Sequence, residues 1–387
     1  MRMLSKLLAG ATVVATVTMV AAGPALADPP TGTTPAAGDV VGVGADTTEN
    51  LLDQLSINYN ATHGSPSLYS WDATNPTTGA IGDSIATKAG CKKIARPDGS
   101  SAGITTLASN VRDPAATANY CVDYARSSRG RKSTDPGLHK GGIEFVRLAT
   151  DAVTYASIDS GSNAPTNLSN TQLQGIYDCS DTTWTSVGGT STQTIKPYLP
   201  ESGSGIASSF LTDIGVSTPG SCVTQPSTLQ QNEGVNAIFT GTNKKNIIIP
   251  FSTGKWIAQA YHSAPCFNVS CATNSHHEIC NAGSGGTNAF GCDVNGKLGL
   301  NDINGTSPTT GSGSSTTVNP SFTPDFILPL YDVVRYSTAT TNHIPPYLEP
   351  FFAAASYSTP GYLCQTAQQS VIEAYGFDTT ILCGSGS

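Results

Sequence analysis

The pattern that most constrains this chain is a β-prone segment that ends in a loop of Ser, Thr and Gly, found four times. In the clearest case, residues 194–199 favour a strand and residues 206–214 have the spacing of an amphipathic helix. The Ser/Gly loop between them directs backbone N–H groups and hydroxyls toward an anion, although Ser204 as a helix N-cap also explains a single such loop. Four of them in one α/β chain indicate a shared ligand site, and they lie at Gly44–Thr48, Gly99–Ile104, Val122–Ser128 and Gly203–Ile206.

Three further segments complete an ordered series with these loops: Phe145–Ala156, Asn167–Trp184 and Leu330–Arg335. In this order, the chain resembles the phosphate-type solute-binding proteins of ABC importers. The resemblance implies an α/β, two-lobed type II periplasmic-binding-protein-like fold, with three-layer α/β lobes joined by crossover strands. It further implies that the lobes close on a small oxyanion or small polar solute, and that an ABC permease is the partner for import.

The resemblance places the ligand contacts on the four loops, with two departures from the family. Ser128 stands where the phosphate binders have an aspartate that accepts the ligand's proton, and Pro200 stands where they have an arginine. Arg96, Arg126 and Arg129 remain candidates for the lost charge. These departures predict that phosphate itself binds weakly. The expected ligand-binding residues are Thr47, Thr48, Ser100, Ser101, Ser127, Ser128, Arg129, Gly203, Ser204, Gly205 and Ile206.

Residues 1–27 are typical of a cleaved signal peptide. Arg2 and Lys6 precede a short apolar stretch, and Ala25–Ala27 provides a cleavage site between small residues. A membrane helix is the alternative, but the apolar stretch is short and ends in small residues. The first cysteine is Cys91, so no cysteine near the cleavage site is available for a lipid anchor. We expect a secreted or cell-wall-associated protein without a lipid anchor.

The charge of the chain argues against nucleic acid as a partner. Without residues 1–27, which hold two basic and no acidic side chains, the 19 basic residues fall to 17 against 27 acidic ones. Phosphate backbones require a concentrated basic face, which this balance does not favour. A small anion remains compatible with it, because local dipoles inside an acidic protein suffice to hold one.

Ten cysteines in an exported chain favour five disulfides. Neighbours in sequence suggest the pairs Cys91–Cys121, Cys179–Cys222 and Cys364–Cys383. The spacing of His276, His277 and Cys280 fits no common zinc pattern, so no metal site is expected. The remaining two bridges are expected among Cys266, Cys271, Cys280 and Cys292.

The length of the chain suggests two domains after the signal peptide. The resemblance implies that the chain crosses to the second lobe and later returns to the first. The expected division is a flexible tail at 28–38, lobe 1 at 39–148 plus 321–387, and lobe 2 at 149–320 with a disulfide-rich insertion at 262–300 and a Ser/Thr/Gly linker at 306–320.

Two other classes of function stay open at this point. A hydrolase such as an exported phosphatase needs an activated nucleophile, but residues 202–205 lack the spacing of a nucleophile elbow. A structural or adhesive wall protein is favoured by the Thr/Ser-rich linkers and by the absence of a lipid anchor. The four ordered loops favour solute binding over both. We expect a monomer without catalytic residues or a cofactor.

Overall fold

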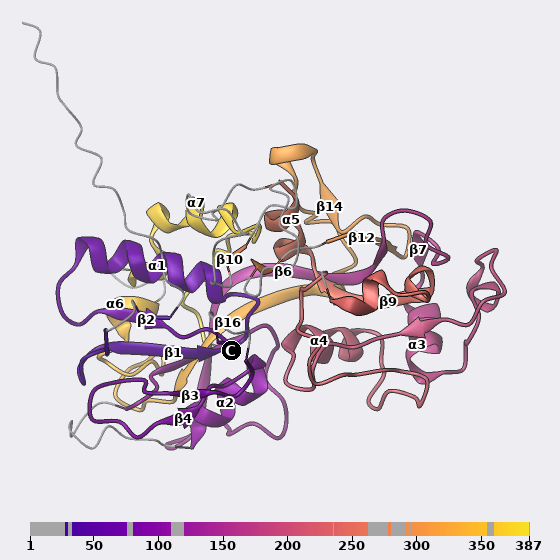
Figure 1. Cartoon of the computed structure of the whole chain (residues 1–387). Coiled ribbons are helices and arrows are strands. Elements are labelled where there is room, and N and C mark those ends of the chain that lie inside the picture. The colour runs from indigo at the N-terminus through magenta and orange to yellow at the C-terminus, as the bar shows by residue number, and fades with distance from the viewer. Residues whose placement is uncertain are drawn as a thin grey trace, which may run out of the picture.

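The computed structural model describes residues 28–29, 33–75, 80–109, 120–234, 236–261, 278–279, 292–293, 296–353 and 360–386. One mixed β-sheet runs through both parts of the molecule (Figure 1). Its strands are β1 (Val40–Gly44), β2 (Leu68–Ser70), β5 (Tyr124–Ser127), β6 (Ile143–Ile158), β8 (Lys196–Pro197), β9 (Ile247–Ser252), β12 (Leu298–Leu300) and β16 (Ile327–Arg335). The strand order is β2-β1-β5-β16-β6-β9-β8, and β12 also pairs with β6.

Strands β6 and β16 connect the two lobes. β6 has 16 residues, which extend about 50 Å in a strand, so it reaches from one lobe into the other (Figure 1). Its residues 143–152 pair antiparallel with β16, and its residues 153–156 pair antiparallel with β9. Since β16 also pairs with β5, the sheets of both lobes are tied to the same two strands.

The C-terminal segment covers the second edge of β6 between the lobes. Val146 forms a bridge with Gly386, and Thr150 forms one with Asp378. Arg147 N–H donates to the Ser385 carbonyl at 2.9 Å. β6 is therefore paired on both edges where it crosses.

Lobe 1 contains β1, β2 and β5 with helices on both faces. Alternate side chains of β1 point to opposite faces of the sheet. Val40 packs with Leu51 and Leu55 of α1, whereas Val43 packs with Ile104 of α2. This arrangement gives three layers. The helices of this lobe are α1 (Glu49–Thr62), α2 (Gly99–Ala108), α6 (Glu349–Phe352) and α7 (Thr366–Ala374).

Lobe 2 is built in the same way around β8 and β9. Ile248 of β9 shares a core with Phe210 of α4, while Ile247 and Ile249 pack with Phe239 on the other face. The helices here are α3 (Asn170–Asp178), α4 (Gly205–Asp213) and α5 (Thr253–Tyr261). None of the helices within the described ranges has both the length and the apolar character to cross a membrane.

Short elements complete the described chain. The short strands are β3 (Ser84–Ile85), β4 (Ile94–Ala95), β7 (Asn167–Leu168), β10 (Glu278–Ile279), β11 (Cys292–Asp293), β13 (Asp302–Ile303), β14 (Thr309–Thr310) and β15 (Thr317–Val318). The 3-10 turns are η1 (Trp184–Val187), η2 (Ala237–Thr240), η3 (Lys244–Asn246), η5 (Gly313–Ser315), η6 (Pro324–Phe326) and η7 (Tyr362–Cys364).

Two segments expected to be loose are ordered by contacts. The expected linker at 306–320 contains the antiparallel hairpin β14–β15, because Val318 and the nearby Phe322 are buried in the protein. In the expected tail, Asp28 forms an ion pair with the buried Arg96 at 2.7 Å, and Pro35 accepts a hydrogen bond from Ala89 N–H. The division of the chain at 148–149 remains a proposal, and it falls inside β6.

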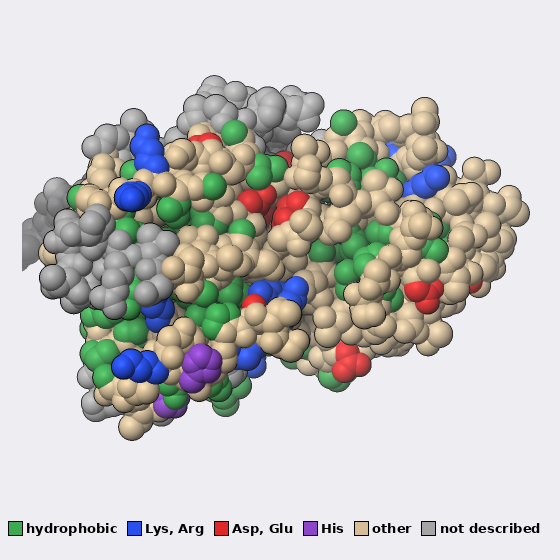
Figure 2. Space-filling view, turned by 90° about the horizontal axis from the view of Figure 1, so that it is seen from below, with side chains coloured by type: hydrophobic (Ala, Val, Ile, Leu, Met, Phe, Trp, Pro, Cys, Tyr) green, Lys and Arg blue, Asp and Glu red, His purple; other side chains and the backbone are tan. Residues whose placement is uncertain are grey.

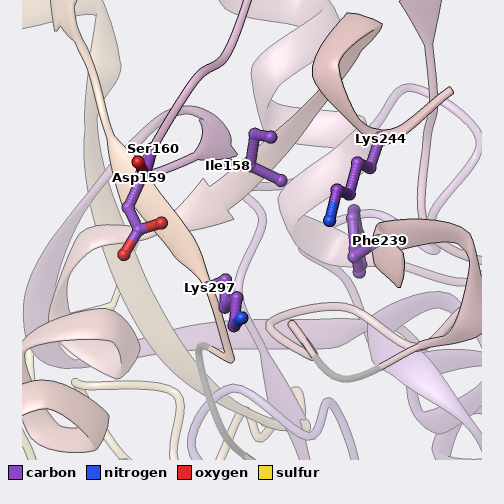
Figure 3. Close-up of a pocket in the computed structure, with 6 residues that line it drawn as sticks. All are labelled: Ile158, Asp159, Ser160, Phe239, Lys244 and Lys297. Carbon is purple, nitrogen blue, oxygen red and sulfur yellow. The ribbon is translucent and has the colours of Figure 1, made fainter. Parts of the chain in front are cut away.

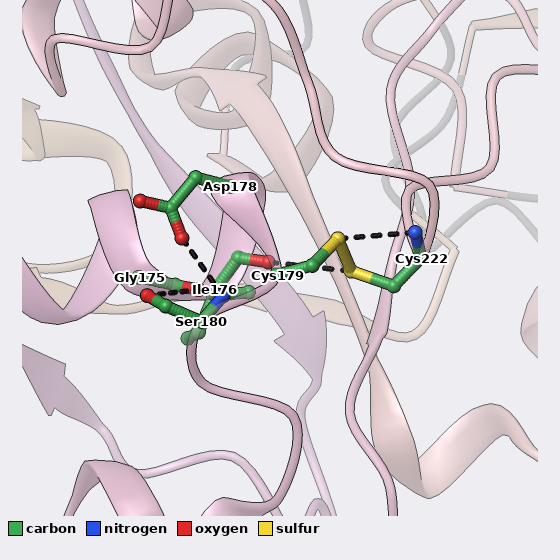
Figure 4. The surroundings of a disulfide bond; sticks show 6 residues. All are labelled: Gly175, Ile176, Asp178, Cys179, Ser180 and Cys222. Atoms are coloured by element: carbon green, nitrogen blue, oxygen red, sulfur yellow. Dashed lines mark hydrogen bonds between the residues drawn. A yellow bond between two sulfur atoms is a disulfide. The ribbon is translucent and has the colours of Figure 1, made fainter.

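Three of the predicted disulfides are present: Cys91–Cys121, Cys179–Cys222 and Cys364–Cys383. Cys179 follows α3 in a left-handed backbone conformation and ends that helix (Figure 4). Asp178 accepts the Ser180 N–H at 2.8 Å beside it. The predicted bridges among Cys266, Cys271, Cys280 and Cys292 involve side chains outside the described residues.

Removing the Cys179–Cys222 bridge should cost more stability than any single surface change. The bond joins residues 43 apart, and in the chain-entropy treatment a closed loop of this length raises the free energy of unfolding by about 4 kcal/mol. We expect Cys179→Ala/Cys222→Ala to lose about 3–4 kcal/mol in urea unfolding. Cys364→Ala/Cys383→Ala, which opens a separation of 19 residues, should lose about 3 kcal/mol. A loss under about 1 kcal/mol for the first variant would contradict this.

Candidate functional site

The N-terminal ends of α1, α2 and α4 meet where the two lobes face each other. α1 and α2 belong to lobe 1 and α4 belongs to lobe 2, and the end of β5 contacts both α2 and α4. A helix N-terminus carries partial positive charge and N–H groups without helical partners. The structure brings the four predicted loops together at this interface. Their buried hydroxyl residues are Thr47, Thr48, Ser100, Ser127, Ser128 and Ser204.

The lobes approach each other closely at Gly205. A carbon added as a side chain to Gly205 would lie 2.3 Å from the hydroxyl oxygens of both Ser100 and Ser128. These two hydroxyls are 3.4 Å apart, and the Ser128 N–H donates to Ser100 Oγ at 3.1 Å. Ser209 Oγ donates from α4 to the Ser128 carbonyl at 3.1 Å. The interface is closed, with lobe 1 hydroxyls directly against the backbone of α4.

The side chain of Gln231 connects α4 to the loop before α1. Ser204 Oγ donates to Gln231 Oε1 at 2.5 Å, and Ile206 N–H donates to the same oxygen at 3.3 Å. At its other end, the Gln231 amide nitrogen donates to Asp46 and, at 3.1 Å, to Thr47 Oγ1. Gln231 therefore holds a neutral oxygen at the N-terminus of α4, where the same donors would stabilise an anionic oxygen.

Asn232 and Lys255 add two more contacts between the lobes. Asn232 Nδ2 donates to Thr47 Oγ1 at 3.2 Å, and its Oδ1 accepts the Ser252 N–H at 3.0 Å. The fully buried Lys255 donates from its ammonium group to Asn50 Oδ1 at 2.7 Å. A buried ammonium needs polar partners to offset its lost hydration. Lys255 therefore brings a positive charge from α5 into the interface.

Strand β9 and helix α5 form a fifth loop of the same kind, which the sequence analysis missed. The apolar run 247–251 is followed by Ser252, Thr253 and Gly254, and the helix starts at once. The signal was the same as in the other four loops. Asp151 already accepts the Gly254 N–H at 2.7 Å and the Ser252 hydroxyl at 2.5 Å. The Ser252 hydroxyl and the Gly254 N–H are therefore already bonded, and this loop contributes its other side chains to the interface.

Two buried hydroxyls at these helix ends have no hydrogen-bond partner among the described residues. They are Oγ1 of Thr48 beside α1 and Oγ1 of Thr253 at α5. Thr48 is the N-cap residue of α1, but its side chain makes no capping bond. A buried hydroxyl without a partner costs free energy, and a ligand oxygen would supply the missing bond. In contrast, Ser204 does cap α4, because its Oγ accepts the Ala207 N–H at 3.0 Å.

The arginines considered from the sequence are all paired inside lobe 1. Arg126 donates to the Ala45 carbonyl at 2.8 Å and to other groups beneath the first loop. Arg129 forms an ion pair with Asp135 at 2.7 Å. Arg96 is paired with Asp28 and with a second aspartate of lobe 1. Basic side chains appear near the junction of the lobes in the view from below, although most of that surface is uncharged (Figure 2).

The other predicted residues divide between the interface and their own loops. Ser101 N–H donates to the Gly203 carbonyl across the interface at 3.4 Å. Ser127 instead turns back, and its hydroxyl donates to the Arg129 carbonyl at 2.8 Å. The Ser127 hydroxyl bond and the ion pair of Arg129 with Asp135 therefore stabilise the loop after β5, and neither of these two contacts reaches lobe 2.

Two carboxylic acids from opposite lobes lie beside this contact. Burial, and then the negative charge of Asp98, raise the pKa of Glu201 to about 8. Burial raises the pKa of Asp98 to about 6, although the hydrogen bond from Gln230 at 3.1 Å opposes the shift. Closing the lobes therefore favours the protonated forms of both acids.

The Gly205→Ala variant should hold the lobes apart. The added carbon would meet two hydroxyls at 2.3 Å and the Ser128 backbone at 3.0 Å, so α4 has to withdraw. We expect a larger radius of gyration in small-angle scattering and unchanged circular dichroism. Gly130→Ala is the matched control, because a carbon there meets nothing within 4 Å. Identical scattering from the two variants would contradict the close approach.

Closure should weaken as pH rises. An acid with a raised pKa in the closed form stabilises that form below its ordinary pKa, and this contribution is lost as pH rises through the raised value. For Asp98 and Glu201 the window runs from about pH 4 to pH 8. We expect the radius of gyration to increase across this window. Glu201→Gln should flatten the profile, whereas Asp178→Asn, which changes an exposed aspartate at the end of α3, should leave it unchanged.

Comparisons with known proteins agree with this architecture. The family described as "PBP superfamily domain" matches residues 29–306. An ABC-type phosphate transport receptor from Vibrio cholerae is 16% identical, with a TM-score of 0.50 over 88% of this chain and 100% of that one. A putative phosphate ABC transporter substrate-binding protein from Clostridium perfringens, solved with bound phosphate, is 12% identical, with a TM-score of 0.51 over 88% and 99%.

At these identities the two structures establish the fold alone. A search of curated proteins finds no match. The family assignment rests on the matched residues, which make up more than half of the chain. It confirms the expected resemblance and favours neither the wall-protein nor the phosphatase hypothesis. The chain therefore belongs to the PBP superfamily.

Proposed function

We propose that this protein captures a small oxyanion between its lobes and delivers it to an ABC permease. The observation that carries the proposal is the meeting of helix N-termini from opposite lobes. Ser100 and Ser128 of lobe 1 face the first turn of α4, which begins with Ser204 as its cap. Hydroxyls and backbone N–H groups in this arrangement replace the water around an oxyanion.

The bonds of Gln231 indicate the chemistry of the ligand. Its carboxamide oxygen occupies the donors of Ser204 and Ile206, and its nitrogen donates to Asp46. A ligand that takes this place needs an acceptor oxygen toward α4 and a donor toward the Asp46 carboxylate. An oxyanion that carries a proton, such as hydrogen phosphate, has both. Fully ionised sulfate has only acceptors.

This assignment changes the expectation drawn from Ser128. The sequence suggested that the proton acceptor of the phosphate binders is lost, which predicted weak phosphate binding. Asp46 belongs to the first loop and is buried at the same interface, so we assign it the role of acceptor. Lys255 is our candidate for the positive charge, because the three arginines are paired elsewhere in lobe 1.

Ligand binding in this proposal exchanges one set of contacts for another. The closed interface has no room for an added atom between Gly205 and the two serines. The ligand therefore enters when the lobes separate, and it replaces Gln231 at α4 as they close again. The hydroxyls of Thr48 and Thr253, which lack partners in the described structure, add bonding capacity near the ligand. The lobes move about β6 and β16.

Export is part of the same proposal. Residues 1–27 act as a cleaved signal peptide, and the mature protein starts near Asp28. Asp28 then begins the folded chain through its ion pair with Arg96. A soluble receptor reaches its permease by diffusion outside the membrane.

Titration calorimetry with phosphate and with sulfate on ligand-stripped protein tests the site. We expect phosphate to bind more tightly than sulfate by about tenfold or more, since one charge-assisted hydrogen bond is worth about 1.5–3 kcal/mol. Asp46→Asn should weaken phosphate binding and so reduce the ratio of the affinities for phosphate and sulfate. Ser204→Ala should weaken the binding of both anions.

The control is Asp178→Asn, which changes an exposed aspartate at the end of α3 and should leave both affinities unchanged. Binding of neither anion would remove the oxyanion proposal. Tight phosphate binding that does not respond to Asp46→Asn or Ser204→Ala would place the ligand elsewhere in the protein.

A further inference from the structure

A pocket of about 420 Å³ opens in lobe 2, away from the interface between the lobes. It is lined by Ile158, Asp159, Ser160, Phe239, Lys244 and Lys297 (Figure 3). Ile158 lies seven residues beyond Asp151 along β6, which corresponds to about 23 Å of extended strand. Asp151 bonds the loop that starts α5, which carries Lys255 of the proposed oxyanion site, so the pocket is separate from that site.

The pocket has an apolar wall that belongs to the core of lobe 2. Ile158 ends β6, and Phe239 lies in η2, and both side chains are almost fully buried. They pack in one cluster with Leu298 of β12 and with alternate residues of β9. Because this wall is continuous with the core, its shape is fixed by packing rather than by a surface loop alone.

Hydrogen bonds hold the surrounding segments in place. Asn236 Oδ1 accepts the Ile238 N–H at 3.2 Å and starts η2. Asp159 N–H donates to the Lys297 carbonyl at 2.7 Å, which joins the end of β6 to the start of β12. Trp256 Nε1 donates to the Leu298 carbonyl at 2.8 Å beside it. The lining residues thus come from segments that are fixed relative to one another.

Two lysine side chains give the pocket a positive charge. Lys244 extends its ammonium group toward Phe239 and Ile158, and Lys297 lies on the other side of the opening (Figure 3). Neither ammonium has an ion pair or a side-chain hydrogen bond within the described ranges. Asp159 also lines the pocket, but its carboxylate forms no ion pair with either lysine within the described ranges.

We propose that this pocket binds a second class of ligand, a small anion with an apolar body. The apolar wall would bury the body, and the two ammonium groups would pair with a carboxylate or sulfonate head. The volume lies within the usual range for small-molecule pockets. Inorganic oxyanions have no apolar surface to bury there, so they do not compete for it.

A fluorescence titration of the protein with 8-anilinonaphthalene-1-sulfonate tests this proposal. The probe has an apolar aromatic body and one sulfonate, and we expect one saturable site. Lys244→Met/Lys297→Met should lower the affinity for the probe by about tenfold, because two partly exposed ion pairs between the probe and the protein are lost. Lys245→Met is the matched control. Lys245 is an exposed neighbour that does not line the pocket, and its removal should change the affinity little.

Competition identifies the ligand class and separates this site from the one between the lobes. Octanoate should displace the probe, whereas acetate, octan-1-ol and inorganic phosphate should not, because each lacks either the apolar body or the charge. Circular dichroism confirms that the variants are folded. Equal affinity in the double variant and the control, absence of saturable binding, or displacement by phosphate would each overturn the proposal. None of these outcomes depends on whether phosphate binds between the lobes.

Discussion

The antiparallel pairing of β6 with β16 is the interaction on which the rest of the molecule depends. β16 pairs on one side with β5, whose end carries Ser128, and β6 continues into lobe 2, where it pairs with β9 and so positions the start of α5. The loops of the candidate site are distant in sequence, yet the strands that carry them are aligned with one another through their pairing with these two strands. A register slip of one residue would turn each side chain to the other face of the sheet and separate the loops.

The parts of the fold that were predictable are those with a local signal. A strand, a hydroxyl-rich loop and a helix start can be recognised within about a dozen residues, and Ser204 caps α4 as expected. The three confirmed disulfides join cysteines that are neighbours in the sequence order. The fifth loop at Ser252 carried the same signal, so its omission was a failure of the interpretation and not of the sequence.

Other features had no local signal. Arg96 is paired with Asp28, and the two are 68 positions apart, so nothing beside the arginine shows that its charge is already used. Gln231 lies outside the named helices and strands, and its importance comes only from contacts with Asp46 and Ser204. The segment 306–320 has the composition of a linker, but it folds as a hairpin because one face of it meets the core at Val318. Tertiary contacts decided each of these cases.

The candidate site relies on dipoles and hydroxyls more than on fixed charges. The sequence has an excess of acidic residues, and the one buried cation that we assign to the site is bonded to Asn50 rather than to a carboxylate in that contact. An anion held in this way is recognised by the direction of donors and acceptors. Such recognition depends on geometry over a few tenths of an ångström, which is why the closeness of the lobes at Gly205 matters.

The crossing between the lobes is a ribbon of three segments, because the C-terminal chain covers the edge of β6 opposite β16. A ribbon of this kind resists bending within its own plane, since bending stretches one edge and compresses the other. It twists about its long axis more readily, because twist is spread over many small changes in backbone dihedral angles. The Cys364–Cys383 bond lies in the chain that forms the third segment and tethers it. We therefore expect lobe motion to include a twist about the long axis of this ribbon, and we expect the C-terminal chain to contribute to its torsional stiffness.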